Sequence, residues 1–274
     1  MPPQVSAADE RLLAAYQEAA LRIQRTLQEL TPKNRTVILR RVDIIISELD
    51  DLAARYLQEA LPLHFREGSD EAIAQLRNLQ GFSDKIDETF GTIHTQALHA
   101  LAGDARLKFG NALQGVRDGA KAAITSSLKQ QMIGELLVSE IEGASNPAKR
   151  VQDILEQQQI SAVQGRKRSY TLEEYSGLIT HNLLADAHNI GAATRYTVNG
   201  VEYFRRIERP DCCDICRPLR DKVLWLGDPR LLPPTHPWCY GGVAPVIGPQ
   251  TDPVMSPDDP RIPQKTRDFL LRKM

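Results

Sequence analysis

The sequence predicts a mainly α-helical protein with a small α+β domain towards its C-terminus, in which one helix precedes a short β-hairpin or knuckle. Apolar residues recur every three or four positions through residues 1–143, which is the spacing of one helix face. Aromatic residues make up only 5% of the chain, so the core must be built mainly from aliphatic side chains. Beyond Asn199-Gly200, a hairpin-type turn, short strand patterns replace the helical one.

The first two helices are marked by capping residues and by continuous apolar stripes. A capping box at Ser6 and Asp9 opens the first helix, and Thr31-Pro32 ends it and opens the second. The stripe of the first helix consists of Leu12, Tyr16, Ala19, Ile23, Leu27 and Leu30. The seam of the second helix consists of Ile38, Val42, Ile45, Leu49, Leu52 and Tyr56. Because this seam is short, we expect it to pack on a partner helix of the same chain rather than in an oligomeric coiled coil.

Helix-breaking residues predict where the second helix ends. Leu61-Pro62 and Gly68-Ser69 are expected to interrupt it, since proline removes a backbone donor and glycine costs conformational entropy. A short helix is then expected from about Asp70 to Gln80, and Ser83 is expected to cap the next one.

The last part of the helical region contains closely spaced glycines. Residues 104–141 have a helical pattern that Gly110, Gly115 and Gly119 interrupt. Each glycine in a helix interior costs about 0.5–1 kcal/mol relative to alanine. The glycines therefore indicate either close packing against a neighbouring helix or a hinge.

The chain then divides into an α+β domain and a tail. Three parts are expected: a helical docking or assembly region at 1–143, the α+β domain at 144–247 and a Pro-rich tail at 248–274. Gly143 to Pro147 is the first boundary. In the α+β domain, Thr171 with Glu174 is expected to open a helix that ends near Ala193. Val201–Ile207 and Lys222–Leu226 are the expected strands.

The tail is expected to be mostly extended and unpacked because prolines recur through it. Its last residues, Lys265–Met274, return to a helix-compatible pattern in which Phe269 and Leu270 are apolar. A helix this short is marginal in water. The segment is therefore either a frayed terminus or a docking peptide tethered by the Pro-rich linker.

The net charge of −1 argues against a protein that holds nucleic acid over its whole surface, because phosphate neutralisation requires many cations. Arg166, Lys167 and Arg168 form the densest local basic run, so any DNA contact should be weak and sensitive to salt. The first residues have no basic start followed by an apolar run, and no stretch is long enough to span a membrane. We expect a protein made in a reducing cytoplasm.

All four cysteines lie between residues 212 and 239, in a pattern that favours a metal site. Cys213 and Cys216 form a C-x2-C pair, and 19 residues later His236 and Cys239 form an H-x2-C pair. Two such chelating pairs joined by a hairpin match a structural zinc site with no open position. The remaining interpretations are a hairpin core that these residues form without metal, a redox-active Cys213–Cys216 pair, and a site in which Cys212 replaces Cys213.

The order of these motifs resembles the phage Mu F-type minor head proteins, also called phage head morphogenesis proteins. The motifs are the helix at Thr180–Tyr196, the strand at Tyr203–Ile207, the C-x2-C pair, the hairpin at Leu219–Trp225, and the segment Pro233-Pro234-Thr235-His236-Pro237-Trp238-Cys239. The resemblance implies a low-copy, non-enzymatic virion component that acts in procapsid assembly inside the phage head. The implied partners are the portal protein, the major capsid protein or both, with zinc held by Cys213, Cys216, His236 and Cys239.

A zinc-containing nuclease of the treble-clef or HNH type is the alternative. His181 and His188 are seven residues apart on one expected helix face, with Asp186 nearby. No third element joins them at a recognisable spacing, and the sequence has no phosphate-binding glycine loop or nucleophile elbow. The sequence therefore favours a protein without enzymatic activity.

Overall fold

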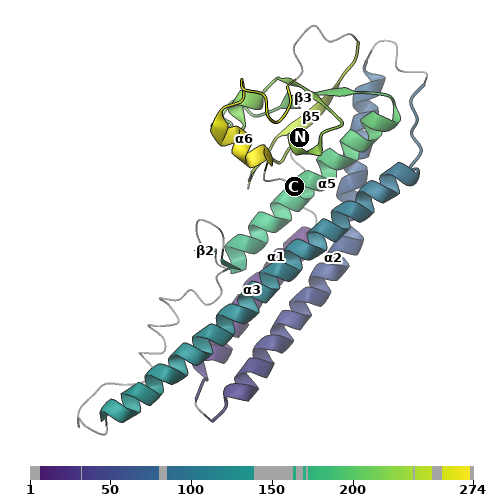
Figure 1. The fold of residues 1–274 in the computed structure, drawn as a ribbon. Helices are drawn as coiled ribbons and strands as arrows, with labels where there is room; N and C mark the ends of the chain where they lie inside the picture. The colour runs from purple at the N-terminus through teal and green to yellow at the C-terminus, as the bar shows by residue number, and fades with distance from the viewer. Residues whose placement is uncertain are drawn as a thin grey trace. The chain divides into compact units, whose positions relative to one another are not determined.

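The computed structural model describes residues 7–31, 33–79, 85–138, 163–164, 169–170, 172–236, 238–248 and 255–271. The predicted fold class is confirmed. A mostly helical N-terminal region precedes a small three-stranded antiparallel sheet and a short C-terminal helix (Figure 1). No helix in the described ranges is both long and apolar enough to cross a membrane. The predicted boundary at Gly143 to Pro147 and the basic run at Arg166–Arg168 lie outside the described residues.

Contacts divide the chain into two compact units, each of which is described by itself. The helical unit comprises Ala7–Tyr56 and Arg106–Ile179. The knuckle unit comprises Leu57–Ala105 and Thr180–Met274. Helices α2 (Arg35–Arg77) and α3 (Thr92–Val138) therefore contribute residues to both units.

The helical unit is built from α1 (Ala7–Gln28) and the parts of α2 and α3 that belong to it. The predicted stripe of α1 is buried, and so is the seam of α2 apart from the half-buried Leu52. Phe109 of α3 is fully buried, and its ring lies 6.2 Å from that of Tyr16 and 6.4 Å from that of Tyr56. The seam thus packs on partner helices of the same chain, as its short length predicts.

The turn between α1 and α2 differs from the predicted one. Helix α2 begins at Arg35 rather than at Pro32, because Asn34 closes the turn. The Asn34 side-chain oxygen accepts a hydrogen bond from the backbone N–H of Thr31 at 2.7 Å. Its side-chain nitrogen donates to the carbonyl of Glu29 at 2.8 Å. The side chain of Asn34 therefore closes the turn that precedes α2, and Thr31 does not cap this helix.

The predicted breaks at Leu61-Pro62 and Gly68-Ser69 are wrong, because α2 runs through both as one helix. Gly68 lies where α2 crosses α5 (Leu172–Val198) within the knuckle unit. A Cβ atom at Gly68 would lie 1.9 Å from the carbonyl oxygen of His188, and one at Gly191 would lie 2.0 Å from that of Phe65. These two glycines therefore permit a close helix crossing, and the burial of apolar neighbours offsets the weak helix propensity of this stretch.

Helix α3 also differs from its expected course. It begins at Thr92, while the preceding residues 85–91 are not helical and Ser83 lies outside the described residues. The guanidinium of Arg195 holds this non-helical segment by donating to the carbonyls of Asp87 and Thr89 at 2.7 and 2.9 Å. The helix runs unbroken through the three glycines. A Cβ atom at Gly110 would meet nothing within 4 Å, so close packing does not explain the glycine there.

The sheet of the knuckle unit has the strand order β4-β3-β5 and is antiparallel throughout. Strand β3 (Tyr203–Ile207) pairs with β4 (Val223–Trp225), so the two predicted strands are confirmed, but the predicted hairpin at Leu219–Trp225 is wrong, because Leu219 ends a 3-10 turn and only β4 lies in that range. Strand β5 (Gly242–Val246) pairs with the other edge of β3. Helix α5 extends to Val198, five residues beyond its predicted end, and carries Tyr196 into the core below the sheet.

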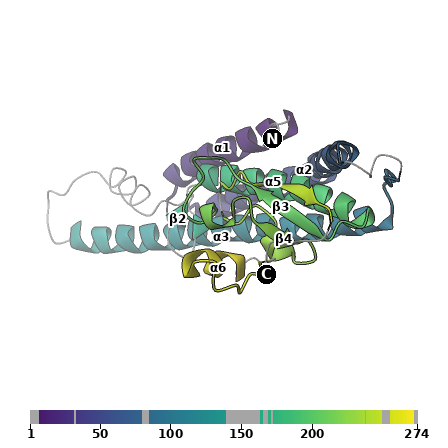
Figure 2. The same ribbon diagram turned by 90° about the horizontal axis from the view of Figure 1, so that it is seen from above.

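The expectation of an unpacked tail is wrong for residues 255–271. Met255 forms a parallel bridge with Leu224 of β4, and Ile262 is fully buried. Helix α6 (Gln264–Leu271) places Leu270 in the core of the knuckle unit, and α6 contacts the 3-10 turn at Pro229–Leu231 (Figure 2). Contacts with residues distant in sequence thus order a segment whose composition is typical of a linker.

Candidate metal centre

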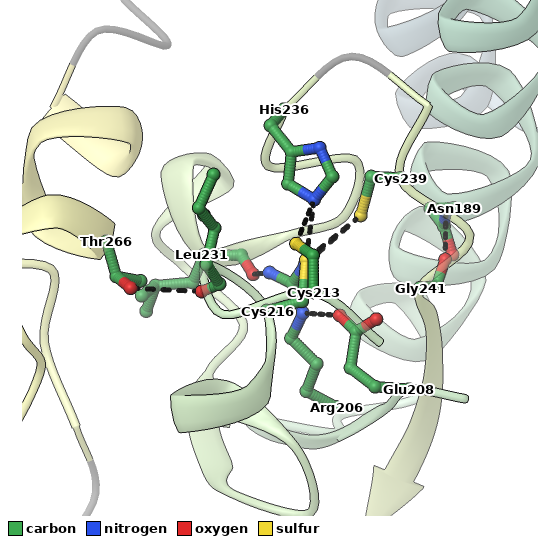
Figure 3. A network of polar contacts seen from close by, with 11 residues as sticks. Asn189, Arg206, Glu208, Cys213, Cys216, Leu231, His236, Cys239, Gly241 and Thr266 are labelled. Carbon is green, nitrogen blue, oxygen red and sulfur yellow. Dashed lines mark hydrogen bonds and ion pairs between the residues drawn. The ribbon is translucent and has the colours of Figure 1, made fainter. Parts of the chain in front are cut away.

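Two tight turns at the end of the sheet carry the four predicted metal ligands. After β3, the backbone N–H groups of Cys216 and Arg217 both donate to the carbonyl of Cys213, at 3.1 and 2.9 Å. Before β5, the N–H of Cys239 donates to the carbonyl of His236 at 3.2 Å. Each chelating pair is therefore held in a closed turn, and the antiparallel pairing of β3 with β5 brings the two turns together (Figure 3).

The ligand atoms of the two pairs converge. The Nε2 atom of His236 lies 3.1 Å from the sulfur of Cys213 and 3.0 Å from that of Cys216. The sulfurs of Cys216 and Cys239 are 3.6 Å apart. A tetrahedral zinc site with Zn–S bonds of about 2.3 Å separates its sulfurs by about 3.8 Å. The spacings among Cys213, Cys216 and His236, and between Cys216 and Cys239, are therefore close to those of a zinc site, whereas the sulfur of Cys239 does not lie within 4.8 Å of the ligand atoms of Cys213 or His236.

Two overlapping groups of potential ligands share Cys216. One comprises Cys213, Cys216 and His236, and the other comprises Glu208, Cys216 and Cys239, with all ligand atoms of each group within 4.8 Å of one another. Cys216 and Cys239 are buried, His236 is half-buried and Cys213 is exposed. The cluster thus extends from the exposed Cys213 to the buried Cys216 and Cys239. The sulfur of Cys239 contacts the cluster through the sulfur of Cys216.

The buried ion pair of Arg206 and Glu208 lies directly against the sulfurs. Its nitrogen–oxygen distance is 2.6 Å, and the two side chains are 0% and 2% exposed. The Nη2 atom of Arg206 donates to the sulfurs of Cys216 and Cys239 at 3.8 and 3.6 Å, and Nη1 donates to the carbonyl of Leu231 at 3.1 Å. The guanidinium therefore offers donors to two sulfurs that, as thiolates, carry negative charge.

These contacts shift the pKa values of the buried groups. The hydrogen bond between Cys216 and Cys239 raises the pKa of the Cys216 thiol and lowers that of Cys239, which the charge of Arg206 lowers further. Burial raises the pKa of Glu208. Burial alone would lower the pKa of Arg206, but Glu208 and the two sulfurs together raise it. Cys239 is therefore the member of the thiol pair that ionises first, and the thiolate is the form that binds metal.

Sequence reasoning missed Arg206 and Glu208. Strand β3 alternates between the two faces of the sheet, and its inward positions are Phe204 and Arg206. The alternation of strand residues places Arg206 in the core. Because a buried charge requires a partner, this arginine could have indicated a buried ion pair. Its partner is two residues along the chain and its sulfur contacts are 10 and 33 residues away, which only the fold reveals.

The structure also places the residues of the alternative interpretations. Cys212 is half-buried, and neither group of potential ligands within the described ranges contains it. The Nε2–H of His181 donates a 3.3 Å hydrogen bond to the carbonyl of Cys239, and the His181 ring stacks on that of Trp238 with the ring centres 5.0 Å apart. His188 pairs with Glu71 at 3.1 Å. The two histidines line one cavity of about 340 Å³ but make contacts with different elements.

Comparison with known proteins finds no match to this chain among family models, curated proteins or solved structures. The fold and the site together define a protein in which an antiparallel sheet, attached to long helices, carries a Cys/His cluster able to hold a metal ion.

Proposed function

We propose that this chain is a minor head protein that acts in phage procapsid assembly and that its Cys/His cluster holds a structural zinc ion. The observation that carries the proposal is the convergence of the C-x2-C and H-x2-C pairs at the end of the β4-β3-β5 sheet. The order of helix, strand, C-x2-C, hairpin, H-x2-C and final strand is the order on which the resemblance to phage head morphogenesis proteins rests.

In this proposal zinc has a structural role. Three cysteines and one histidine fill a tetrahedral coordination shell and leave no position open for substrate or water. The ion would cross-link the loops after β3 and before β5, and its binding free energy would become folding free energy of the knuckle unit. The long helices and the other surfaces of the chain would then be available for the portal protein, the major capsid protein or both.

The metal is tested by elemental analysis of the full chain purified in reductant without chelators. We expect about one zinc per chain, as one closed tetrahedral site implies. Cys216→Ser should lose the metal, because Cys216 belongs to both ligand groups. The matched control is Cys212→Ser, which should retain it. A wild-type chain without metal, or loss of zinc from Cys212→Ser alone, would contradict this ligand set.

The assembly role is tested by the composition of purified phage heads. The chain should co-sediment with portal and coat subunits at a copy number far below that of the coat protein. A phage that lacks the chain should produce defective heads, and supply of the Cys212→Ser variant should restore assembly more fully than supply of Cys216→Ser. Intact heads without the chain would overturn the proposal.

A zinc-containing nuclease remains the second candidate, and the cavity shared by His181, His188 and Glu71 is the observation that favours it. The test is incubation of the purified protein with single- and double-stranded DNA in the presence of Mg²⁺ or Mn²⁺. The head-protein proposal expects both substrates to stay intact. Cleavage that is lost in His181→Ala or His188→Ala would favour the nuclease.

A further inference from the structure

Helix α6 is held in place by the same turn that carries the C-x2-C pair. The hydroxyl of Thr266 donates a 3.0 Å hydrogen bond to the backbone carbonyl of Ile215, which lies between Cys213 and Cys216. Thr266 is fully buried, so this hydrogen bond is shielded from water. One end of α6 therefore depends on the position of a carbonyl inside the metal-binding turn.

A second contact joins α6 to the other chelating pair. The ring of Phe269 meets the imidazole of His236 edge-on, with the ring centres 6.3 Å apart at an angle of 78°. Leu270, the next residue, is fully buried in the core of the knuckle unit. The helix thus touches both ligand turns, and Figure 3 shows Thr266 beside the cluster.

Helix α6 has only eight residues, from Gln264 to Leu271. An isolated helix of this length is not stable in water, because the cost of nucleation is not recovered. Its order must therefore come from the surface on which it sits. That surface comprises the 3-10 turn at Pro229–Leu231, the core around Leu270 and the two ligand turns, which a bound metal ion would cross-link and which are tied together less firmly without it.

We propose that metal binding at the Cys213, Cys216, His236 and Cys239 cluster docks helix α6, and that loss of the metal releases it. This inference rests on the metal centre of the proposed function. Release exposes Phe269 and Leu270, with Lys265 and Arg267 beside them, as an apolar and basic segment at the end of the chain. The segment that the sequence left as either a frayed terminus or a docking peptide is then covered in the metal-loaded protein.

Coupling between two binding events is reciprocal. If the metal strengthens the docking of α6 by some factor, the docked helix strengthens metal binding by the same factor. Substitutions on α6 that leave all four ligands unchanged should therefore weaken metal retention. Thr266→Val removes the hydrogen bond to Ile215 at nearly constant volume, and Phe269→Ala removes the ring contact with His236.

The first experiment measures hydrogen exchange of the full chain in reductant, with zinc bound and after removal of zinc by EDTA. The amides of residues 264–271 should exchange about fivefold to a hundredfold faster without zinc, the usual range of coupling between two sites. The amides of α1 in the helical unit should be unaffected, and those of β3 should be affected less than those of α6.

The second experiment measures the transfer of zinc to a competing chelator. At equilibrium with the chelator, Thr266→Val and Phe269→Ala should bind zinc about fivefold more weakly than the wild type, or more weakly still. Lys265→Ala is the matched control, because Lys265 lies on the same helix with an exposed side chain. Wild-type protein without zinc would overturn the metal centre together with this inference. Zinc that is present, but whose removal leaves α6 unchanged or loosens β3 as much as α6, would overturn the coupling alone.

Discussion

The two units of this protein use their charged residues in different ways. The helical unit packs aliphatic and aromatic side chains between helices, with the buried Asp9 next to Tyr56, and the ion pairs among its described residues lie at the surface, as in Arg22–Glu48, whose side chains are 42% and 53% exposed. The knuckle unit buries the Arg206–Glu208 pair against two cysteines. A small sheet has little apolar surface to bury, and a charged group in its interior requires a partner. The comparison indicates that the knuckle unit is the more sensitive of the two to single substitutions and to solvent conditions.

Both tryptophans, Trp225 and Trp238, lie in the knuckle unit. Tryptophan fluorescence therefore follows the unfolding of this unit. Far-UV circular dichroism reports on the long helices of both units. The two measurements together therefore distinguish unfolding of the knuckle unit from unfolding of the helical unit.

The largest difference in the free energy of unfolding is expected between variants that break a buried ion pair and variants that break an exposed one. Arg206→Met leaves the carboxylate of Glu208 buried without its cation, which should lower the free energy of unfolding of the knuckle unit by about 3–5 kcal/mol. Arg22→Ala in the helical unit should cost less than about 1 kcal/mol, because an exposed pair is screened by water. Urea unfolding followed by the two spectroscopic methods provides both values.

A double variant sharpens this result. Arg206→Met combined with Glu208→Gln removes both charges and should recover part of the loss, because the uncompensated carboxylate accounts for most of it. If the double variant were less stable than Arg206→Met alone, the carboxylate of Glu208 would have stabilising contacts other than its ion pair with Arg206.

Alanine substitutions at two glycines should change the stability of the protein in opposite directions. Gly68→Ala places a methyl group 1.9 Å from a carbonyl oxygen of α5, and the helices must move apart at a cost of about 1–3 kcal/mol or more. Gly110→Ala meets nothing and should stabilise the protein by about 0.5–1 kcal/mol through helix propensity. Thermal unfolding curves should shift in opposite directions. A destabilising Gly110→Ala would support a functional hinge in α3.

The smallest expected effect is on the pH dependence of the free energy of unfolding. All six histidines lie in the knuckle unit, and burial lowers the pKa of His94, His181 and His188. These rings stay neutral in the folded protein at a pH where the unfolded chain binds protons. The contribution of these histidines to the free energy of unfolding should therefore be constant above about pH 7 and fall as the pH decreases through the ordinary histidine value near 6.5.

His94 provides the variant for this test. Its ring lies against those of Phe65 and Phe90, and its two nitrogens have no hydrogen-bond partner among the described residues. His94→Phe should therefore reduce the loss of stability between about pH 7 and pH 5, measured as the urea midpoint of tryptophan fluorescence. An unchanged pH dependence would show that His94 takes up its proton without loss of structure.

Much of the fold could be predicted because it depends on neighbours in sequence. The buried stripe of α1 and the seam of α2 follow from helical spacing, and the strands β3 and β4 follow from runs of strand-forming residues. The candidate ligands could be predicted for the same reason, since a C-x2-C or H-x2-C pair closes a chelate within a single turn. These features involve residues two to four positions apart, whose relative placement hardly depends on the rest of the chain.

The tertiary structure decided the features in which distant residues meet. Gly68 breaks no helix because α5 packs against it, and Arg206 is buried because Glu208 and the sulfurs of Cys216 and Cys239 surround it. The tail is ordered because Leu270 and Thr266 find places in the core and at the metal-binding turn. Local propensities are worth about 1 kcal/mol or less per residue, whereas burial of one large apolar side chain is worth about 1.5–3 kcal/mol. Packing therefore overrides local preference wherever the two disagree.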